Sequence, residues 1–208
     1  MAFIGNMLRK KVIQINYQEL KTNIKALAFE EADTMAEYEE MDIIPTAINR
    51  AITILADTVL PIVKSYEISL DGEDGDYLFF DMSMLVKDFL AFDAHPVRID
   101  DGNVYKVFGD YTIEGDDTLV IPGSVSGTVK IFYKASHTPY VSGGSMDEVE
   151  IPLKRRIHHL VPLLASYYVW LDDDPTKAAQ YYNQYETAST AVLNGANAPR
   201  ARILEGGI

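Results

Sequence analysis

Residues 66–80 of the 208-residue chain read YEISLDGEDGDYLFF. Apolar and polar side chains alternate from Tyr66 to Leu70, which is the period of a strand with one buried face. Two Asp-Gly pairs, at 71–72 and 74–75, then supply the backbone that tight reversals require, and a second apolar run begins at Tyr77. This stretch therefore predicts two antiparallel strands joined by a turn.

The alternation of strand and turn continues from this stretch to Tyr133. We expect strands at 66–70, 77–80, 97–99, 104–108, 111–114, 118–121 and 128–133. The run from Met82 to Phe92 fits either a short helix or an extended segment. Strands with one face in water predict a small antiparallel sandwich or open barrel within residues 66–149.

The two flanks of this module have helical periodicity instead. A first helix is expected to begin at the cap residue Asn16 and to bury Leu20, Ile24, Leu27 and Ala28. A second helix is expected to begin at a cap on Asp42 and to end or kink at Pro61.

Two further helices are expected after Pro152. Apolar residues at helical spacing predict a helix over 153–171 with a kink or break at Pro162. The pair Asp174-Pro175 predicts the start of a last helix that ends near Leu193. The predicted fold class is α+β: a helical bundle from residues 17–65 and 150–194, with a β-sandwich or barrel-like module inserted at 66–149. Residues 1–16 are expected to be an N-terminal arm and 195–208 a C-terminal tail.

Charge is concentrated in the predicted β module. The chain has a formal net charge of −13, and residues 66–149 carry 16 acidic and 5 basic side chains. Cysteine is absent, which excludes disulfides, iron–sulfur clusters and thiol nucleophiles. Apolar runs end well short of the roughly 18 residues that a membrane span needs, so neither membrane insertion nor secretion is indicated.

Candidate motifs for catalysis or metal binding lack the required residues at the required spacing. The acidic run 71–76 has Gly75 where a calcium loop needs a ligand, and Val125 stands where a nucleophile elbow needs serine. His158 and His159 are adjacent on a helix and point about 100° apart, so they cannot clamp one metal ion. We therefore expect no enzyme, no cofactor and no metal site.

Two clusters indicate contacts with other proteins. Lys154-Arg155-Arg156 is a basic patch that suits an acidic neighbour and is too small for a nucleic-acid footprint on an acidic chain. Six large aromatic residues crowd the last two predicted helices: Tyr167, Tyr168, Trp170, Tyr181, Tyr182 and Tyr185. Because tyrosine and tryptophan are favoured at interfaces, we expect the chain to self-associate.

Several structural motifs follow one another along the chain in a characteristic order. A helix with Ala47-Ile48-Asn49-Arg50-Ala51 leads into strand motifs Tyr111-Thr-Ile-Glu-Gly115 and Gly127-Thr-Val-Lys-Ile-Phe-Tyr133, followed by Glu150-Ile151-Pro152 and Asp173-Asp-Pro-Thr-Lys-Ala-Ala179. Over residues 42–190 this order resembles the head-to-tail adaptor proteins of tailed bacteriophages. The chain departs from that family at Val86-Lys87-Asp88, where the family commonly has proline and aspartate.

The resemblance implies a structural virion protein at the head–tail interface, made in the cytoplasm of a bacterial host. Its subunits would form a ring, typically a dodecamer, beneath the portal protein, contact tail or nozzle proteins, and let double-stranded DNA pass through a central channel during genome ejection. Arg155 and Arg156 are our candidates for polar contact with a neighbour or the portal, and Trp170, Tyr182 and Tyr185 for apolar contact.

An acidic wall would repel DNA phosphates, so acidic residues of the module are candidates for the channel lining. They are Asp71, Asp74, Asp76, Asp116 and Asp117. The alternative for these residues is an outward-facing hairpin tip that keeps the subunit soluble. For the whole protein, the alternatives are another phage connector or tail component, such as a stopper or tail terminator, or a small enzyme or carbohydrate-binding module.

Overall fold

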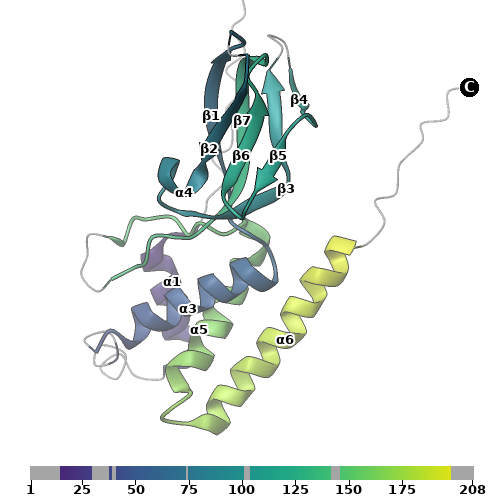
Figure 1. Cartoon of the computed structure of the whole chain (residues 1–208). Coiled ribbons are helices and arrows are strands. Elements are labelled where there is room, and N and C mark those ends of the chain that lie inside the picture. Colours follow the sequence, from purple (N-terminus) through teal and green to yellow (C-terminus); the bar gives the residue numbers. More distant parts are fainter. Residues whose placement is uncertain are drawn as a thin grey trace, which may run out of the picture. The chain divides into compact units, whose positions relative to one another are not determined.

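The computed structural model describes residues 15–29, 38, 41–73, 75–100, 104–141 and 146–197. Over these residues the chain is α+β, as predicted, with five α-helices and two antiparallel sheets (Figure 1). Neither sheet closes into a barrel. The chain divides into two compact units.

The first unit combines the two ends of the chain. It takes in the chain up to Ile48, Tyr140–Ile151 and the chain from Arg155 onward. Its main helices are α1 (Tyr17–Ala28), α5 (Leu160–Trp170) and α6 (Pro175–Asn197). Helix α5 contacts both α1 and α6. The core side chains include Leu20, Ile24, Ile157, Leu160, Leu164 and Ala178.

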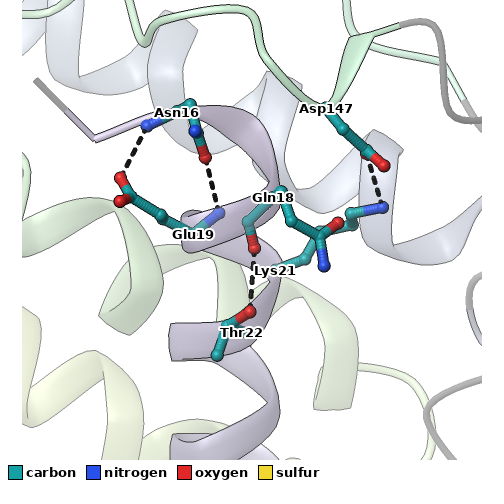
Figure 2. A network of polar contacts seen from close by, with 6 residues as sticks. All are labelled: Asn16, Gln18, Glu19, Lys21, Thr22 and Asp147. Carbon is teal, nitrogen blue, oxygen red and sulfur yellow. Dashed lines mark hydrogen bonds and ion pairs between the residues drawn. The ribbon is translucent and has the colours of Figure 1, made fainter.

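Helix α1 begins at Asn16, as predicted, in a capping box that Figure 2 shows. The Asn16 side-chain oxygen accepts the N–H of Glu19 at 2.8 Å, and the Glu19 carboxylate accepts the N–H of Asn16 at 3.1 Å. The predicted buried stripe was wrong at Leu27, which is 38% exposed. Tyr17 and Lys21 are buried instead, because they lie three or four residues from Leu20 and Ile24 on the same face.

Segment 146–151 holds the start of α1. The N–H groups of Tyr17 and Gln18 donate to the carbonyls of Val149 and Asp147 at 3.0 and 3.1 Å, so helix donors that have no partner within α1 are paired. The Lys21 ammonium lies 2.9 Å from the Asp147 carboxylate (Figure 2). The same ammonium lies 5.0 Å from the centre of the Tyr17 ring.

The prediction of one kinked helix over 153–171 was wrong. Residues Arg155–Ile157 form a short 3₁₀-helix, and α5 begins only at Leu160. Pro162 is therefore the third residue of α5, in the turn whose N–H groups lack a partner within the helix, and it needs no kink. Helix α6 begins as predicted, because the Asp174 carboxylate accepts the N–H of Lys177 at 2.9 Å. It continues beyond Leu193 to Asn197.

Helix α3 (Ile43–Thr58) begins in the first unit and ends in the second. It follows Asp42, which has a positive φ of 58° and whose carbonyl accepts the N–H of Thr46 at 3.1 Å. The start of the helix is thus as predicted, with a left-handed residue before it. The helix ends ahead of Pro61, where the N–H groups of Val59 and Leu60 both donate to the carbonyl of Leu55.

The second unit contains both sheets and consists of Asn49–Pro139 with Pro152–Lys154. Its boundaries thus differ from the 66–149 set by the strand pattern, because the second half of α3 belongs with the sheets. The four-stranded sheet has the order β1-β7-β3-β4 and the three-stranded sheet the order β2-β6-β5. The strands are β1 (Val63–Asp71), β2 (Tyr77–Asp81), β3 (Phe89–Asp100), β4 (Tyr105–Val107), β5 (Thr112–Glu114), β6 (Thr118–Pro122) and β7 (Ser126–Ala135).

Every predicted strand is present, and the ambiguous run from Met82 to Phe92 contains both candidate structures. Residues Met82–Leu85 form the short helix α4, capped by the Asp81 carboxylate, and β3 then begins at Phe89. The buried residues of β7 alternate as a strand with one buried face requires, whereas Leu119, Val120 and Ile121 of β6 are all buried. Those of β7 include Val129, Ile131 and Tyr133.

Candidate functional site

The basic residues Arg155 and Arg156 lie on the 3₁₀-helix that precedes α5 and are exposed. Lys154, just before them, is exposed as well. Ile157, next in the chain, is fully buried in the first unit and fixes this short turn in place. The two guanidinium groups are therefore presented by an anchored turn instead of by a continuous helix.

Four tyrosines form a continuous cluster on α5 and α6, which we call the tyrosine cluster. The ring of Tyr167 lies 4.8 Å from that of Tyr168 and 5.0 Å from that of Tyr182, and the rings of Tyr182 and Tyr185 lie 5.9 Å apart. Tyr185 is buried, whereas Tyr182 is 38% exposed. The cluster thus has a buried base and an exposed rim.

Tyr182 also has an altered acidity. The carboxylate charge of Glu186, one helical turn away, raises the pKa of the Tyr182 hydroxyl, with smaller contributions from burial and from Tyr185. A hydrogen bond between the hydroxyl and the Glu186 carboxylate also contributes to this rise in pKa. Together with the exposed part of its ring, this hydroxyl gives Tyr182 the mixed apolar and polar character that interfaces favour.

Trp170, the third predicted apolar contact residue, lies among groups of its own unit. The Lys177 ammonium lies 3.8 Å above the indole, and the rings of Phe29 and Tyr38 lie 5.4 and 5.6 Å from it. Tyr38 also donates a hydrogen bond to the Asp173 carboxylate. Trp170 thus links α5 and α6 to the segment that follows α1, and Tyr182 offers more surface than Trp170 or Tyr185 to a partner.

The four acidic candidates that lie within the described residues do not form one patch. Asp71 ends β1 and Asp76 precedes β2, and the N–H of Gly123 donates to the Asp76 carbonyl at 2.6 Å. Asp116 and Asp117 lie between β5 and β6, at the opposite end of β2, where the N–H of Met82 donates to the Asp117 carbonyl. The five residues of β2 separate the two groups by about 17 Å. Asp74 lies outside the described residues.

Asp71 has a local structural role. Its carboxylate accepts the N–H of Glu73 at 3.1 Å, and Gly72 follows with a φ of 76°. This is the turn that the Asp-Gly pair predicted. At the other end of β2, the Asp81 carboxylate accepts the N–H groups of Ser83 and Met84, and the hydrogen bond from the Ser83 hydroxyl lowers the pKa of Asp81.

Sequence reasoning did not identify the exposed aromatic side chains of β2. Tyr77 and Phe79 are 64% and 61% exposed and lie two residues apart, hence on one face of an edge strand. Composition alone cannot give this feature, because the order β2-β6-β5 decides which strand is at the edge. Tyr77–Asp81 contains neither Lys nor Pro, the residues that commonly mark edge strands, so nothing in the sequence identified β2 as an edge strand.

A cavity of about 250 Å³ lies within the second unit. It is lined by six apolar residues, together with Asp57 and Lys134. Among the described residues, no group of three or more His, Asp or Glu side chains is arranged to hold a metal ion. Likewise, none of the helices traced in those residues has the length and apolar character to cross a bilayer.

Comparisons with known proteins leave the family open. No protein-family model matches the chain, and no curated protein is significantly similar to it.

Proposed function

We propose that this protein is a ring-forming adaptor of a tailed bacteriophage, which joins the portal to the tail and forms part of the DNA channel. The order of helical and strand motifs over residues 42–190 carries the proposal. A unit built from both ends of the chain, interrupted by a β-rich unit, is consistent with it. The resemblance further implies tail or nozzle proteins as partners and a ring that is typically a dodecamer.

The architecture that goes with this proposal is a helical bundle bearing a β-sandwich. Fully buried residues on the central strands of both sheets, Leu119 and Ile121 on β6 and Val129 and Ile131 on β7, support a common core between the sheets. Sheets that pack face to face bury alternate residues, as β7 does at Val129 and Ile131.

Self-association is supported by the exposed rim of the tyrosine cluster. In a ring, each identical subunit uses two different faces, so one face of the subunit must complement the other. Tyr182 is the residue of the cluster that we assign to such a contact. Arg155 and Arg156, exposed on an anchored turn, are assigned to an acidic surface of the neighbour or of the portal protein.

The test is the mass of the purified chain, measured alone and with a portal protein. We expect a closed ring alone or a defined complex of chain and portal. Reversing Arg155 and Arg156 to Glu should weaken portal binding or ring closure more than Lys154→Glu, which changes a neighbouring exposed charge. A chain that stays monomeric with and without portal would contradict the proposal, and a complex with a tail-tube protein alone would favour a terminator.

The acidic residues give two separate hypotheses for the channel lining, one for each end of β2. Asp71 and Asp76 lie at one end of β2, and Asp116 and Asp117 at the other, so reversal of each pair to Lys tests each end alone. If one end faces the channel, reversal at that end should impair DNA retention or ejection, because basic groups would hold the phosphates. If phage carrying each of the two double variants infect normally, neither end of β2 lines the channel. The acidic residues at these ends then serve solubility instead.

A further inference from the structure

The free edge of β2 can be located from two hydrogen bonds that flank the strand. The N–H of Gly123 donates to Asp76, and the N–H of Met82 donates to Asp117. Both pairs continue the register between β2 and β6, in which Leu78 is opposite Ile121 and Phe80 opposite Leu119. Because hydrogen-bonded and non-hydrogen-bonded pairs alternate in an antiparallel ladder, even-numbered residues bond to β6. The N–H and C=O groups of Tyr77, Phe79 and Asp81 therefore point to the outer edge.

Within the described residues, this edge lacks the Lys, Pro and bulge that commonly keep natural edge strands from pairing. Such strands are usually very short, or carry Lys, Pro or a bulge. Strand β2 has five residues in regular register and no Lys or Pro, and its Tyr77 and Phe79 side chains are among the most exposed apolar groups of the described chain. By contrast, β5 at the opposite edge has three residues, Thr112–Glu114. The β2 edge is thus suited to accept an added strand.

The charge and composition of the two chain ends indicate which of them would supply the added strand. Carboxylates flank β2 at both ends: Asp71, Glu73 and Asp76 at one, Asp81, Asp116 and Asp117 at the other. The first 14 residues of the chain, MAFIGNMLRKKVIQ, carry three basic and no acidic side chains, with apolar residues before and after them. Residues 200–205 carry two Arg and one Glu, a weaker complement. A basic, apolar segment matches an apolar edge between carboxylates.

We propose that residues 1–14 of one copy add as a strand to the outer edge of β2 in a second copy. The segment ends at Ile15, whose carbonyl accepts the N–H of Ile151, so its exit point is fixed on the first unit. Fourteen extended residues span up to about 45 Å, more than twice the roughly 17 Å length of β2. The inference rests on the self-association in the proposed function, and it does not depend on the portal.

Hydrogen–deuterium exchange of the full-length chain tests the pairing. At concentrations where the chain associates, we expect at least tenfold slower exchange at Tyr77, Phe79 and Asp81 than in the diluted monomer, with no such change at Ile113. The register makes Ile113 the matched position, because its N–H points to the outer edge of β5. Slow exchange of β2 that persists in the diluted monomer would overturn pairing with a second copy.

Charge variants identify the segment that pairs. The triple change R9E/K10E/K11E should restore fast exchange along β2, whereas R200E/R202E should leave it slow. The reverse result would assign the edge to the C-terminal segment and overturn the proposal. These substitutions change no residue of the described helices and strands, so they still test the pairing if an edge variant fails to fold.

Backbone variants test the edge directly. Phe79→Pro removes one outward N–H without removing a hydrogen bond to β6, and proline is tolerated on an edge of this kind. It should weaken association at least tenfold more than Phe79→Ala, while Ile113→Pro should not. An assembled ring with equal exchange at β2 and β5 would overturn this inference and leave the adaptor proposal intact. If the chain is monomeric throughout, a synthetic peptide of residues 1–14 must slow exchange at β2, or the inference fails.

Discussion

At the scale of single residues, helix caps and glycines have assignable roles. Asn16 and Glu19 satisfy each other's backbone N–H groups in the capping box (Figure 2), which is the arrangement that the Asn-x-x-Glu spacing allows. Gly127 has a φ of 118°, and a Cβ there would lie 2.9 Å from the carbonyl oxygen of Asp100. Sequence indicated the cap, but the close approach at Gly127 depends on how β3 pairs with β7.

Asn16→Ala should destabilise the protein by about 1 kcal/mol, because the N–H of Glu19 loses its acceptor. The measurement is urea unfolding followed by circular dichroism. Asn16→Asp keeps an acceptor and should cost much less. As a second control, Thr22→Ala removes only a hydroxyl that donates to the carbonyl four residues earlier, and it should be nearly neutral. Equal losses in all three variants would contradict a capping role.

Alanine at three glycines should give a graded loss of stability in thermal unfolding. Gly75→Ala should be nearly neutral, because its φ is not positive and no atom lies near the new Cβ. Gly115→Ala should cost about 1 kcal/mol for a left-handed backbone at a φ of 62°, with open space around it. Gly127→Ala should cost more, since it adds the close contact with a backbone oxygen. A Gly127 variant as stable as the Gly115 variant would contradict the contact.

At the scale of elements, Asp88 ties the turn before β3 to two strands. Its carboxylate lies 2.5 Å from the Lys64 ammonium on β1 and accepts the Tyr133 hydroxyl of β7 at 3.1 Å. Burial opposes its ionisation, but the hydrogen bond and charge of Lys64 and the bond from Tyr133 outweigh burial, so the pKa of Asp88 lies below its usual value. Burial, together with the Asp88 charge, raises the pKa of Tyr133 to about 12.

Stability should therefore fall when Asp88 becomes protonated. A carboxyl group with a lowered folded-state pKa stabilises the fold above its unfolded-state pKa, and this contribution is lost as the pH falls through the folded-state pKa. Wild type should lose more unfolding free energy between pH 7 and pH 3 than Asp88→Asn does. Lys64→Met should also lose less unfolding free energy than wild type over this pH range, because it removes the main group that lowers the pKa of Asp88. Identical pH profiles for wild type and both variants would contradict this role.

At the scale of the whole molecule, the exposed surfaces differ in what they contribute. In the tyrosine cluster, Tyr185 is buried and the Tyr167–Tyr182 ring contact joins α5 to α6, whereas the exposed part of Tyr182 is available to a partner. The outer edge of β2 is a separate surface on the other unit. An assembly that uses both would employ two chemically different surfaces of each subunit, and a ring of identical subunits requires two different faces on each subunit.

Tyr182→Ser should weaken self-association at least tenfold and leave the unfolding temperature within about 2 °C of wild type, because the side chain is part exposed. Mass photometry over a dilution series measures the association. Tyr185→Ser should instead lower the unfolding temperature, since that side chain is buried. Val107→Ser, at an exposed site on β4, should change neither property. Unchanged association in the Tyr182 variant would remove this cluster from the interface.

The sequence by itself determined the elements of this protein, and the tertiary structure determined its surfaces. Alternation of the kind seen in YEISLDGEDGDYLFF, the Asn16 cap and the Asp174-Pro175 pair are local signals. They located all seven strands and the starts of α1 and α6, although β3 extends back to Phe89 from the predicted 97–99. The start of α5 at Leu160 did not follow from local signals. A proline fits a helix interior badly and a first turn well, and the apolar spacing alone does not say in which of these two positions Pro162 lies.

Strand order decided two features of the second unit. One is the exposure of Tyr77 and Phe79, and the other is the division of the acidic residues between the two ends of β2. Strand order is set by contacts between residues far apart in the chain. Local periodicity cannot encode these contacts, since it repeats identically in central and edge strands.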